Sequence, residues 1–343
     1  MAPGGRHRDT LRSADRPSSK TLPCSGDGSS AAGATVPSGT IGSEGAALPR
    51  LGDDCWVLSG PTASGKTALA VRLAARLAAE IVSVDSMAVY AGLDIGTATP
   101  TAAEQAAIPH HCLDLVRPSE AFSVAQWLVA TATAIDAIRS RGRRVLLVGG
   151  TPLYLRSLRD GLAPLPPEDR SVRERLAAEA AEQGTPSLHA RLAAVDPVAA
   201  ARIHPNDAKR IVRALEVAEV TGRPLSDSWH APSGADGNAR SATFASQMLV
   251  IDLPRHILHD RIDRRVKRMF AEGLIEETRG AIEGGGIGLT ARQGAGYEEA
   301  IAVIEGRLSR DEAIERTKAR TRQLAKRQLT WLRSFKDAIW IGG

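Results

Sequence analysis

The sequence predicts an α/β protein in which a parallel sheet is flanked by helices and interrupted by a mostly helical insertion. Short apolar runs typical of buried strands occur at 55–58, 81–84 and 145–148, and helical spacing fills 124–140. Strands that alternate with helices favour a parallel sheet with crossover helices. Beyond a group of three prolines the pattern becomes helical and charged up to about residue 221, which predicts the insertion.

The composition is that of a globular protein with a basic balance. The 343 residues are 43% hydrophobic but only 3% aromatic, so Ala, Leu, Val and Ile must fill the core. The formal net charge is +5 and the pI is about 9.4, which favours a polyanionic partner such as nucleic acid. Arg far outnumbers Lys and Ala is abundant, so a compositional bias contributes to this charge.

Several kinds of protein are excluded by what the sequence lacks. No apolar run approaches the ~20 residues that cross a bilayer, and the N-terminus has no secretory signal, so we expect a cytoplasmic protein without membrane contact. Cys24, Cys55 and Cys112 form no CxxC pair, which argues against a disulfide framework or a zinc site. Adjacent side chains point in different directions, so His110 and His111 are not expected to join Cys112 on one metal ion.

Changes in composition and periodicity divide the chain into four segments. The N-terminal residues are rich in Gly, Ser, Ala, Pro and Thr without periodicity, so we expect them to be disordered and assign them no function. A strand at 248–251 and helices at 255–280 and about 310–335 follow the insertion. The predicted segments are a disordered extension at 1–52, the first part of the core domain at 53–164, the insertion at 165–243 and the second part of the core at 244–343.

The segment GPTASGKT at 60–67 carries the strongest chemical signal. It fits the pattern GxxxxGK[ST] and lies between the strand at 55–58 and an Ala/Leu-rich helix that should run to about Ala79. The glycines let backbone N–H groups surround phosphate oxygens, and the helix N-terminus adds the positive end of its dipole. Lys66 would place a charge on the terminal phosphates, and Thr67 would ligate Mg²⁺. We therefore expect a sheet like that of the P-loop NTPases.

One carboxylate is expected beside this loop. The strand at 145–148 ends in Gly149-Gly150-Thr151 without an acid, whereas the strand at 81–84 ends in Asp85-Ser86. Ligands bind beyond the carboxyl ends of parallel strands, so Asp85, Ser86 and Thr151 should gather around the loop. Asp85 would act as a general base or hold magnesium through water, and we favour the base.

Three predicted helices are basic. From 307 to 336 there are ten Lys or Arg and three acids, with Lys318, Arg322 and Lys326 on one stripe and Arg316, Arg320 and Arg327 on a second. The helix that begins after Asn206-Asp207 carries Lys209, Arg210 and Arg213, and another carries Arg261, Arg265 and Arg268. Charge concentrated on single elements favours nucleic-acid binding, although a solvated face or an Arg directed at the diphosphate would give the same pattern.

Five stretches of the sequence together form a specific combination: GPTASGKT at 60–67, VSVDSMAVYAGLDIGTATP at 82–100, VGGTPLYLRSLRDGL at 148–162, HPNDAKRIVRALEV at 204–217 and TRQLAKRQLTWLR at 321–333. In this combination the sequence resembles the bacterial tRNA dimethylallyltransferases, over about residues 54 to 340. The resemblance implies transfer of a dimethylallyl group from dimethylallyl diphosphate to the exocyclic N6 amine of the adenosine 3′-adjacent to the anticodon, in tRNAs that read codons starting with U. The implied partners are dimethylallyl diphosphate and the anticodon stem-loop of tRNA, with Mg²⁺ as cofactor and a monomer as the working form.

The resemblance also assigns roles to residues. Asp85, Thr151 and Lys66 would take part in the reaction, and Arg261 would join the loop in binding diphosphate. The implied loop ligands are Gly60, Pro61, Thr62, Ala63, Ser64, Gly65, Lys66 and Thr67, a motif on which ATP binding is also often assigned. With the basic stripe added, the predicted tRNA contacts are Asp85, Ser86, Met87, Ala88, Thr151, Arg173, Lys209, Arg210, Ile211, Val212, Arg213, Gln293, Gly296, Tyr297, Lys326 and Arg327.

The sequence departs from the family pattern at two places and leaves other functions open. Pro152 follows Thr151 where Gly or Met is expected, and the motif at 294–297 reads GAGY where a branched apolar residue is expected before Gly-Tyr. The main alternative is a P-loop small-molecule kinase that uses ATP and needs no basic helical surface. An enzyme that prenylates free adenine nucleotides and a nucleotide-controlled RNA-binding switch are further alternatives.

Overall fold

The structure is a computed structural model and describes residues 49, 51–163, 165–230, 244 and 247–342. Nearly all of the predicted disordered extension at 1–52 and most of the predicted loop at 222–243 lie outside the described residues. Within that loop, Leu225–His230 is described and forms a 3₁₀ helix, which the sequence did not predict. No helix in the described part of the chain is long and apolar enough to cross a membrane.

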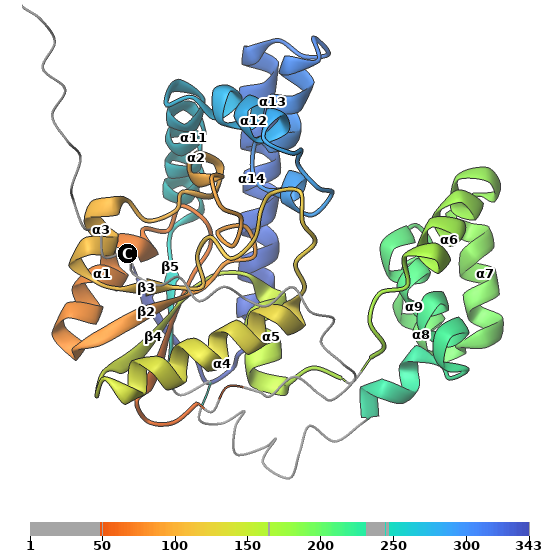
Figure 1. Ribbon diagram of the computed structural model, residues 1–343, viewed down its shortest axis with the longest axis horizontal. Coiled ribbons are helices and arrows are strands. Elements are labelled where there is room, and N and C mark those ends of the chain that lie inside the picture. The colour runs from red at the N-terminus through yellow and green to blue at the C-terminus, as the bar shows by residue number, and fades with distance from the viewer. Residues whose placement is uncertain (1–48, 50, 164, 231–243, 245–246, 343) are drawn as a thin grey trace, which may run out of the picture. The chain divides into compact units, whose positions relative to one another are not determined.

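The core is a six-stranded sheet in which every strand pair is parallel (Figure 1). The strand order is β3-β2-β4-β1-β5-β6. The four strands expected from apolar runs are confirmed, whereas β3 and β6 are too short or too exposed to give such a run. The strands are β1 Cys55–Ser59, β2 Ala79–Val84, β3 His110–His111, β4 Arg144–Gly149, β5 Met248–Asp252 and β6 Ile339–Gly342.

The core helices that the sequence predicts are confirmed with two corrections, and the structure adds four that it did not predict, at 94–97, 102–107, 152–160 and 297–304. The helix after the phosphate loop ends at Leu77, two residues early, because Ala78 takes a left-handed conformation. The single helix expected over 255–280 is two helices, because Gly273 breaks it with φ 106°. The core helices are α1 Lys66–Leu77, α2 Asp94–Thr97, α3 Ala102–Ala107, α4 Val124–Ser140, α5 Pro152–Asp160, α11 Arg255–Ala271, α12 Leu274–Glu283, α13 Tyr297–Ile304 and α14 Arg310–Leu332, with a 3₁₀ turn at Ala291–Gln293.

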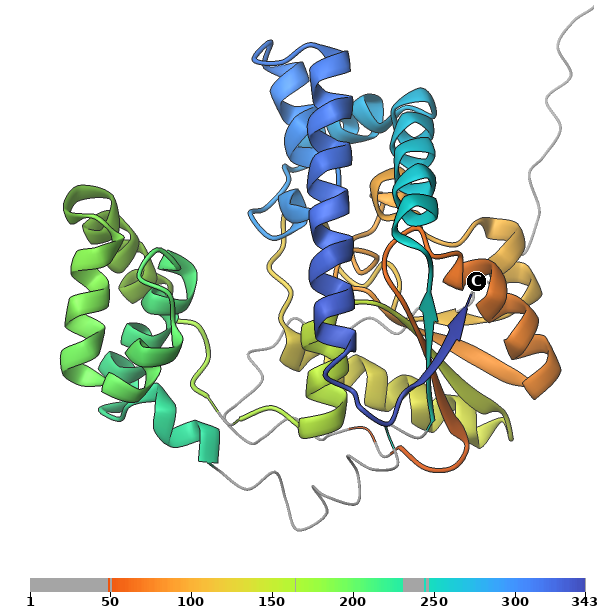
Figure 2. The same cartoon turned by 180° about the vertical axis from the view of Figure 1, so that it is seen from behind.

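The sheet is covered on both faces, which explains why its strands read as continuous apolar runs. Every residue of β2 is buried, as expected of a parallel strand between two helical layers. Trp127 of α4 stacks on Tyr154 of α5 at 4.2 Å between ring centroids and donates its indole N–H to the Ser83 carbonyl. Helices α11 and α14 pack against each other and run side by side in both views (Figure 2).

The insertion has a hydrophobic core of its own, built from helices α6 Arg170–Gln183, α7 Thr185–Val195, α8 Pro197–Arg202 and α9 Ala208–Thr221. Leu176, Leu188 and Leu192 are fully buried in it, together with Ile211 of α9. The predicted N-terminal cap of α9 is Asp207, whose side chain accepts from the Arg210 N–H. These four helices therefore fold as a unit around leucine-rich faces.

Candidate active site

The proposed chemistry gathers at the carboxyl ends of β1, β2 and β4, which are neighbours in the sheet. Ser59 at the end of β1 donates its hydroxyl hydrogen to the Gly149 carbonyl at the end of β4 over 2.7 Å. The Ser86 N–H, just beyond β2, donates to Thr151 Oγ1 over 3.1 Å. The phosphate loop, Asp85-Ser86 and Thr151 thus form one site, as the strand-end argument predicts.

Glycine is required where these strand ends approach each other. A Cβ atom on Gly149 would lie 2.1 Å from the Val84 carbonyl oxygen, so any side chain there would force β2 and β4 apart. Thr151 then caps α5 with Pro152 at the first helical turn, a position that Pro favours. The Thr151 hydroxyl makes no hydrogen bond to its own helix, so its oxygen is available to accept from the Ser86 N–H. The proline that departs from the family pattern therefore suits the helix start.

The phosphate loop has the conformation of an anion cradle. Ala63 and Gly65 adopt φ values of 63° and 90°, and the Ser64 N–H donates to the Pro61 carbonyl over 3.2 Å. The loop leads directly into α1, whose first N–H groups are free to bind an anion. The Ser64 hydroxyl is buried and has no hydrogen-bond partner among the described residues. A phosphate oxygen would supply the missing acceptor, so the residues present fit a diphosphate.

Three cations surround the loop. Lys66 Nζ donates to the Pro61 carbonyl over 3.3 Å, and Arg261 Nη1 donates to the Ser64 carbonyl over 3.1 Å. Arg265 donates to Thr62 Oγ1 over 3.1 Å and to a carbonyl of α2 over 3.2 Å. The sequence indicated Arg261 as a ligand but gave Arg265 no individual role. Its position one helical turn after Arg261 was the available signal, because residues i and i+4 share a helix face.

The charge of Asp85 acts on two of these cations, Lys66 and Arg265. Burial lowers the pKa of Lys66 to about 8, with nearby Asp85 opposing the shift and Arg265 adding to it. Burial likewise lowers the pKa of Arg265, again opposed by Asp85. One Asp85 oxygen accepts from the Met87 N–H over 2.8 Å, and the other accepts from no described residue. The carboxylate is therefore held in place with one oxygen open beside the phosphate loop.

We expect binding of inorganic diphosphate to weaken as the pH rises through about 8. Below that pH the Lys66 ammonium is charged, whereas above it the amine is neutral and must take up a proton when the anion binds. Calorimetry in buffers of different ionisation enthalpy would measure this proton uptake together with the Kd. Lys66→Arg is the control, because a guanidinium stays charged over this range. The same pH dependence of the Kd and the same proton uptake in both proteins would contradict the assignment.

The protein oxygens near the loop could bind Mg²⁺ only if the phosphates of a bound substrate supplied further ligands. No group of three or more His, Cys, Asp or Glu capable of holding a metal occurs among the described residues. Mg²⁺ commonly uses one or two protein oxygens together with phosphates and water. Thr67, the second residue of α1, makes no side-chain hydrogen bond to a described residue, so its hydroxyl is available as one such ligand.

Two polar residues of the site were missed in the sequence, the buried Gln328 and the partly exposed Glu277. Gln328 of α14 accepts from the Thr62 N–H and donates to the Gly150 carbonyl, both over 2.9 Å. Glu277 of α12 accepts from two backbone N–H groups at the start of α2 over 2.8 Å each. Gln328 had a signal in the sequence, because it interrupts the apolar face of its helix. Only the folded chain shows which groups they bind.

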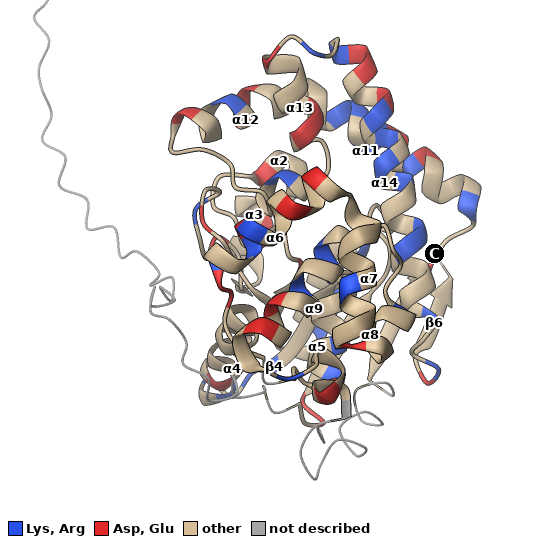
Figure 3. Cartoon of the chain, turned by 90° about the vertical axis from the view of Figure 1, so that its right-hand side faces the viewer, with Lys and Arg blue, Asp and Glu red and all other residues tan. Residues whose placement is uncertain are grey.

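The basic stripes of α14 are partly neutralised within the protein, because three of their members form ion pairs with acids of the same chain. Lys318 is buried and pairs with Glu315 at 2.5 Å, and Arg320 pairs with Glu299 at 2.8 Å. Arg322 forms a bidentate pair with Asp263 of α11. By contrast, Lys326 and Arg327 are exposed and make no ion pair with a described residue. Figure 3 shows Lys and Arg along α11 and α14, with Asp and Glu between them.

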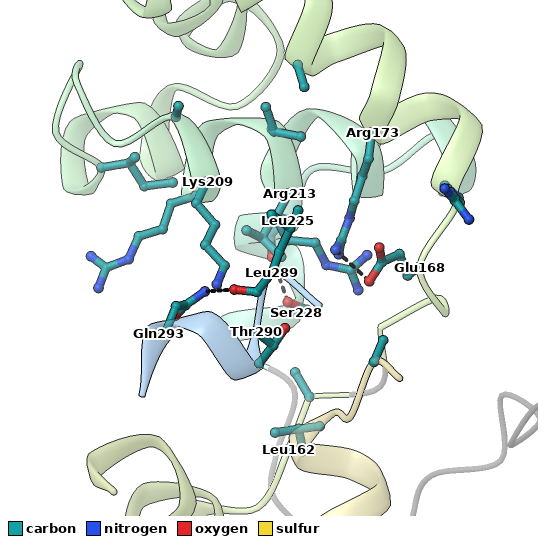
Figure 4. A pocket seen from close by; sticks show the side chains of 18 of the residues that line it. Leu162, Glu168, Arg173, Lys209, Arg213, Leu225, Ser228, Leu289, Thr290 and Gln293 are labelled. Atoms are coloured by element: carbon teal, nitrogen blue, oxygen red, sulfur yellow. Dashed lines mark hydrogen bonds and ion pairs between the residues drawn. The ribbon is translucent and has the colours of Figure 1, made fainter. Parts of the chain in front are cut away.

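Six of the predicted tRNA contacts line one large pocket with a volume of about 1650 Å³ (Figure 4). None of its lining residues belongs to the phosphate loop. The cations are not all free, because the buried carboxylate of Glu216 accepts from Arg173 over 2.9 Å and from Arg213 over 2.7 Å. Arg173 also turns to Glu168 in Figure 4. The six residues are Arg173, Lys209, Arg210, Val212, Arg213 and Gln293.

Sequence comparison decides the family. The family model described as IPP transferase matches residues 88–335, and the one described as Isopentenyl transferase matches residues 54–120. A tRNA dimethylallyltransferase of Anaeromyxobacter dehalogenans is 50% identical over 285 residues, covering 83% of this chain and 93% of the relative. The chain belongs to the tRNA dimethylallyltransferase family. A second tRNA dimethylallyltransferase, from Geobacter metallireducens, is 49% identical and covers 83% of this chain and 91% of its own length.

Solved structures of tRNA dimethylallyltransferases and their relatives share the fold. A tRNA isopentenylpyrophosphate transferase of Bacillus halodurans superposes with a TM-score of 0.59 at 38% identity, covering 84% of this chain and 89% of that one. A eukaryotic dimethylallyltransferase, captured acting on tRNA, superposes with a TM-score of 0.66 at 28% identity, covering 83% and 73%. The predicted resemblance and the P-loop-like fold class are confirmed, and the kinase alternative is not favoured.

Within this tRNA dimethylallyltransferase fold, three of the residues predicted to contact tRNA have buried side chains. Ile211 packs in the core of the insertion, Ala88 is 5% exposed, and Tyr297 is buried with its hydroxyl donated to Glu277 over 2.8 Å. Their side chains pack against neighbouring residues, so a contact of these three residues with tRNA would be made by their backbone. Gly296 is buried as well and has a left-handed φ of 91° at the start of α13.

Each of the two adjacent histidines makes a hydrogen bond within the protein. His110 Nδ1 bonds to the Ile108 carbonyl over 2.7 Å, and His111 Nε2 bonds to Glu80 over 2.7 Å. Cys112 is buried, and burial raises the pKa of its thiol to about 11. A thiol held protonated in this way is a poor metal ligand.

Proposed function

We propose that this protein transfers a dimethylallyl group from dimethylallyl diphosphate to the N6 amine of the adenosine 3′-adjacent to the anticodon. The products are N6-dimethylallyladenosine in the tRNA and free diphosphate, and the substrates are tRNAs that read codons starting with U. The observation that carries the proposal is the meeting of the phosphate loop with Asp85 and Thr151 at one edge of the sheet. Membership of a family whose relatives are named for this transfer supports it.

In the proposed reaction the bond between the allylic carbon and the diphosphate oxygen breaks, and the bond from N6 to that carbon forms. The loop N–H groups, Lys66, Arg261 and Arg265 would stabilise the charge that develops on the departing diphosphate. Mg²⁺, bound through Thr67 and the diphosphate, would add positive charge there. The open Asp85 oxygen would accept the proton that N6 loses, and Thr151 would hold the Asp85-Ser86 turn through its bond to Ser86.

The target adenine must leave its stack to reach this site. A purine stacked in an anticodon loop presents only an edge, and enzymes that modify a base extrude it into a pocket. The basic residues Lys209, Arg210, Lys326 and Arg327 would hold the RNA backbone while the base is out. Excluding water from the site would protect the allylic group from hydrolysis. The proposed working form is a cytoplasmic monomer.

One incubation tests the proposal against its alternatives. Purified protein, unmodified tRNA and dimethylallyl diphosphate are combined with Mg²⁺, and the nucleosides are analysed by mass spectrometry after digestion. The proposal expects adenosine to gain one dimethylallyl unit only when all components are present. Prenylation of free adenosine monophosphate in place of tRNA would support the sister activity. Turnover of ATP without tRNA would support a kinase, and unchanged tRNA would support a binding switch.

The exposed cations of α14 give a second test. Replacing Lys326 by Glu should weaken tRNA binding about tenfold at physiological salt, because a phosphate contact is lost and a like charge is added. The slope of log Kd against log salt should fall in magnitude by about one. Arg72→Glu is the matched control, since Arg72 is exposed on α1 without an ion pair to a described residue. Equal losses for the two variants would show general electrostatics and remove Lys326 from the interface.

A further inference from the structure

Gln328 uses both ends of its amide to join the two halves of the active site. It lies on the buried face of α14 and is only 8% exposed. Its Oε1 accepts from the Thr62 N–H in the phosphate loop over 2.9 Å, and its Nε2 donates to the Gly150 carbonyl beyond β4 over 2.9 Å. The orientation of the amide is fixed by its partners, because an N–H requires an acceptor and a carbonyl requires a donor.

The bond to the loop controls more than one atom. The Thr62 N–H and the Pro61 carbonyl belong to the same peptide group, which is planar and trans, so they point in opposite directions. That carbonyl accepts from the Ser64 N–H over 3.2 Å and from Lys66 Nζ over 3.3 Å. Holding the N–H end therefore sets the carbonyl end, which turns the loop at Ser64 and receives the ammonium of Lys66.

The other bond fixes the Thr151 side of the site. Gly150 precedes Thr151, whose hydroxyl oxygen receives the Ser86 N–H. The approach is close, since a Cβ atom on Gly150 would lie 2.6 Å from the Gly60 carbonyl oxygen and 3.0 Å from Gln328 Nε2. One amide thus braces the loop against the end of β4. Among uncharged side chains of this length, only Gln offers an acceptor and a donor from the same terminal group.

We propose that Gln328 is a positioning residue for the transfer reaction, which sets the Pro61–Thr62 peptide and through it the place of Lys66 relative to Thr151. The inference rests on the proposed function for its link to catalysis, although its link to diphosphate binding stands on geometry alone. Lys326 and Arg327 occupy the two preceding positions on α14. The helix that offers free cations to RNA is consequently also the support of the diphosphate loop.

Two variants test this role. Gln328→Met keeps the length of the side chain but removes both hydrogen bonds, and Gln328→Glu keeps the acceptor but removes the donor. For Gln328→Met we expect the Kd for inorganic diphosphate and the KM for dimethylallyl diphosphate to rise about tenfold, with the Kd for tRNA within about twofold of wild type. Gln328→Glu should bind diphosphate no better than the Met variant, since it adds negative charge beside the anion. Gln183→Met, at the end of α6, is the matched control.

A role in packing alone predicts a different pattern. Loss of packing would lower the melting temperature. It would either raise the Kd for diphosphate and the Kd for tRNA together or leave both unchanged. Unchanged diphosphate affinity, KM and kcat in folded Gln328→Met would overturn the inference. A different result would refute only the proposed function. In that case the wild-type protein would not transfer the dimethylallyl group to tRNA, yet it would bind diphosphate, and Gln328→Met would still weaken that binding.

A measurement on the wild-type protein keeps the inference testable if neither variant folds. The Thr62 amide should be protected from hydrogen exchange in the free protein, because Gln328 already accepts from it. Exchange can be followed by NMR on the full-length chain without ligand. Exchange of the Thr62 amide at the rate of an exposed loop would show that the Gln328 bond is absent in solution, and the inference would fail.

Discussion

Replacing Asp85 by Asn should lower kcat about a thousandfold while leaving the affinities for tRNA and dimethylallyl diphosphate close to those of the wild type. Asn keeps the size of the side chain and can still accept from the Met87 N–H, but it cannot take the N6 proton. General base catalysis contributes roughly a hundredfold to ten-thousandfold in rate, which sets the expected loss. Single-turnover prenylation of tRNA, with binding measured separately, gives the required numbers.

The same variant separates the two roles considered for Asp85. A carboxylate that held Mg²⁺ through water would, when replaced, raise the Mg²⁺ concentration needed for activity, and high Mg²⁺ would restore the rate. A general base would leave the Mg²⁺ dependence unchanged. Asp136→Asn, an exposed position on α4, controls for the loss of a surface carboxylate. Wild-type kcat in Asp85→Asn would remove the residue from the mechanism.

Replacing Lys66 by Met should reduce kcat/KM for dimethylallyl diphosphate by roughly a hundredfold to a thousandfold. The ammonium lies at the phosphate loop, where charge develops on the leaving diphosphate, and a preorganised charge there acts most strongly in the transition state. The melting temperature should not fall, because the variant removes a cation whose burial opposes its charged form.

The control for this change is Lys336→Met, which removes an exposed ammonium beyond the end of α14. It should leave kcat/KM unchanged. A Lys66→Met protein that kept wild-type kcat/KM would mean that the loop N–H groups and the two arginines suffice for the leaving group. A large drop in melting temperature would instead show that the bond from Lys66 to the Pro61 carbonyl is needed for folding.

The core of the fold was predictable because its signals are local. Strands buried on both faces read as apolar runs, and β1, β2, β4 and β5 all appear in this way. The phosphate loop was predictable because its spacing fixes its chemistry. Strand β3 has only two residues, and β6 is exposed at an edge, so neither leaves a readable pattern.

The charge count along α14 was a less reliable guide to its RNA-binding cations than the apolar runs were to the strands. A count gives the positions of the charges but not the acids that pair with them. Lys318 and Arg322 belong to the same predicted stripe as Lys326, yet the first two are bound by Glu315 and Asp263 within the protein. Asp263 lies 59 residues away from Arg322 along the chain, on α11. The pairing of Lys318 with Glu315 at i−3 can be read from the spacing within α14, but no pattern within α14 could have shown that Arg322 is bound by Asp263 of α11.

The amino-acid sequence determined four of the six strands, the phosphate loop and the presence of a single acid at the end of β2, because each depends on neighbouring residues. Only the tertiary structure decided how these parts are held. The bond of Gln328 to Thr62 joins residues 266 positions apart, and that of Glu277 to Ile95, which is partly buried, joins residues 182 apart. A buried polar group needs a hydrogen-bond partner, and the partner can come from any part of the chain that the fold brings near. The periodicity of the sequence therefore does not show which residue that partner is.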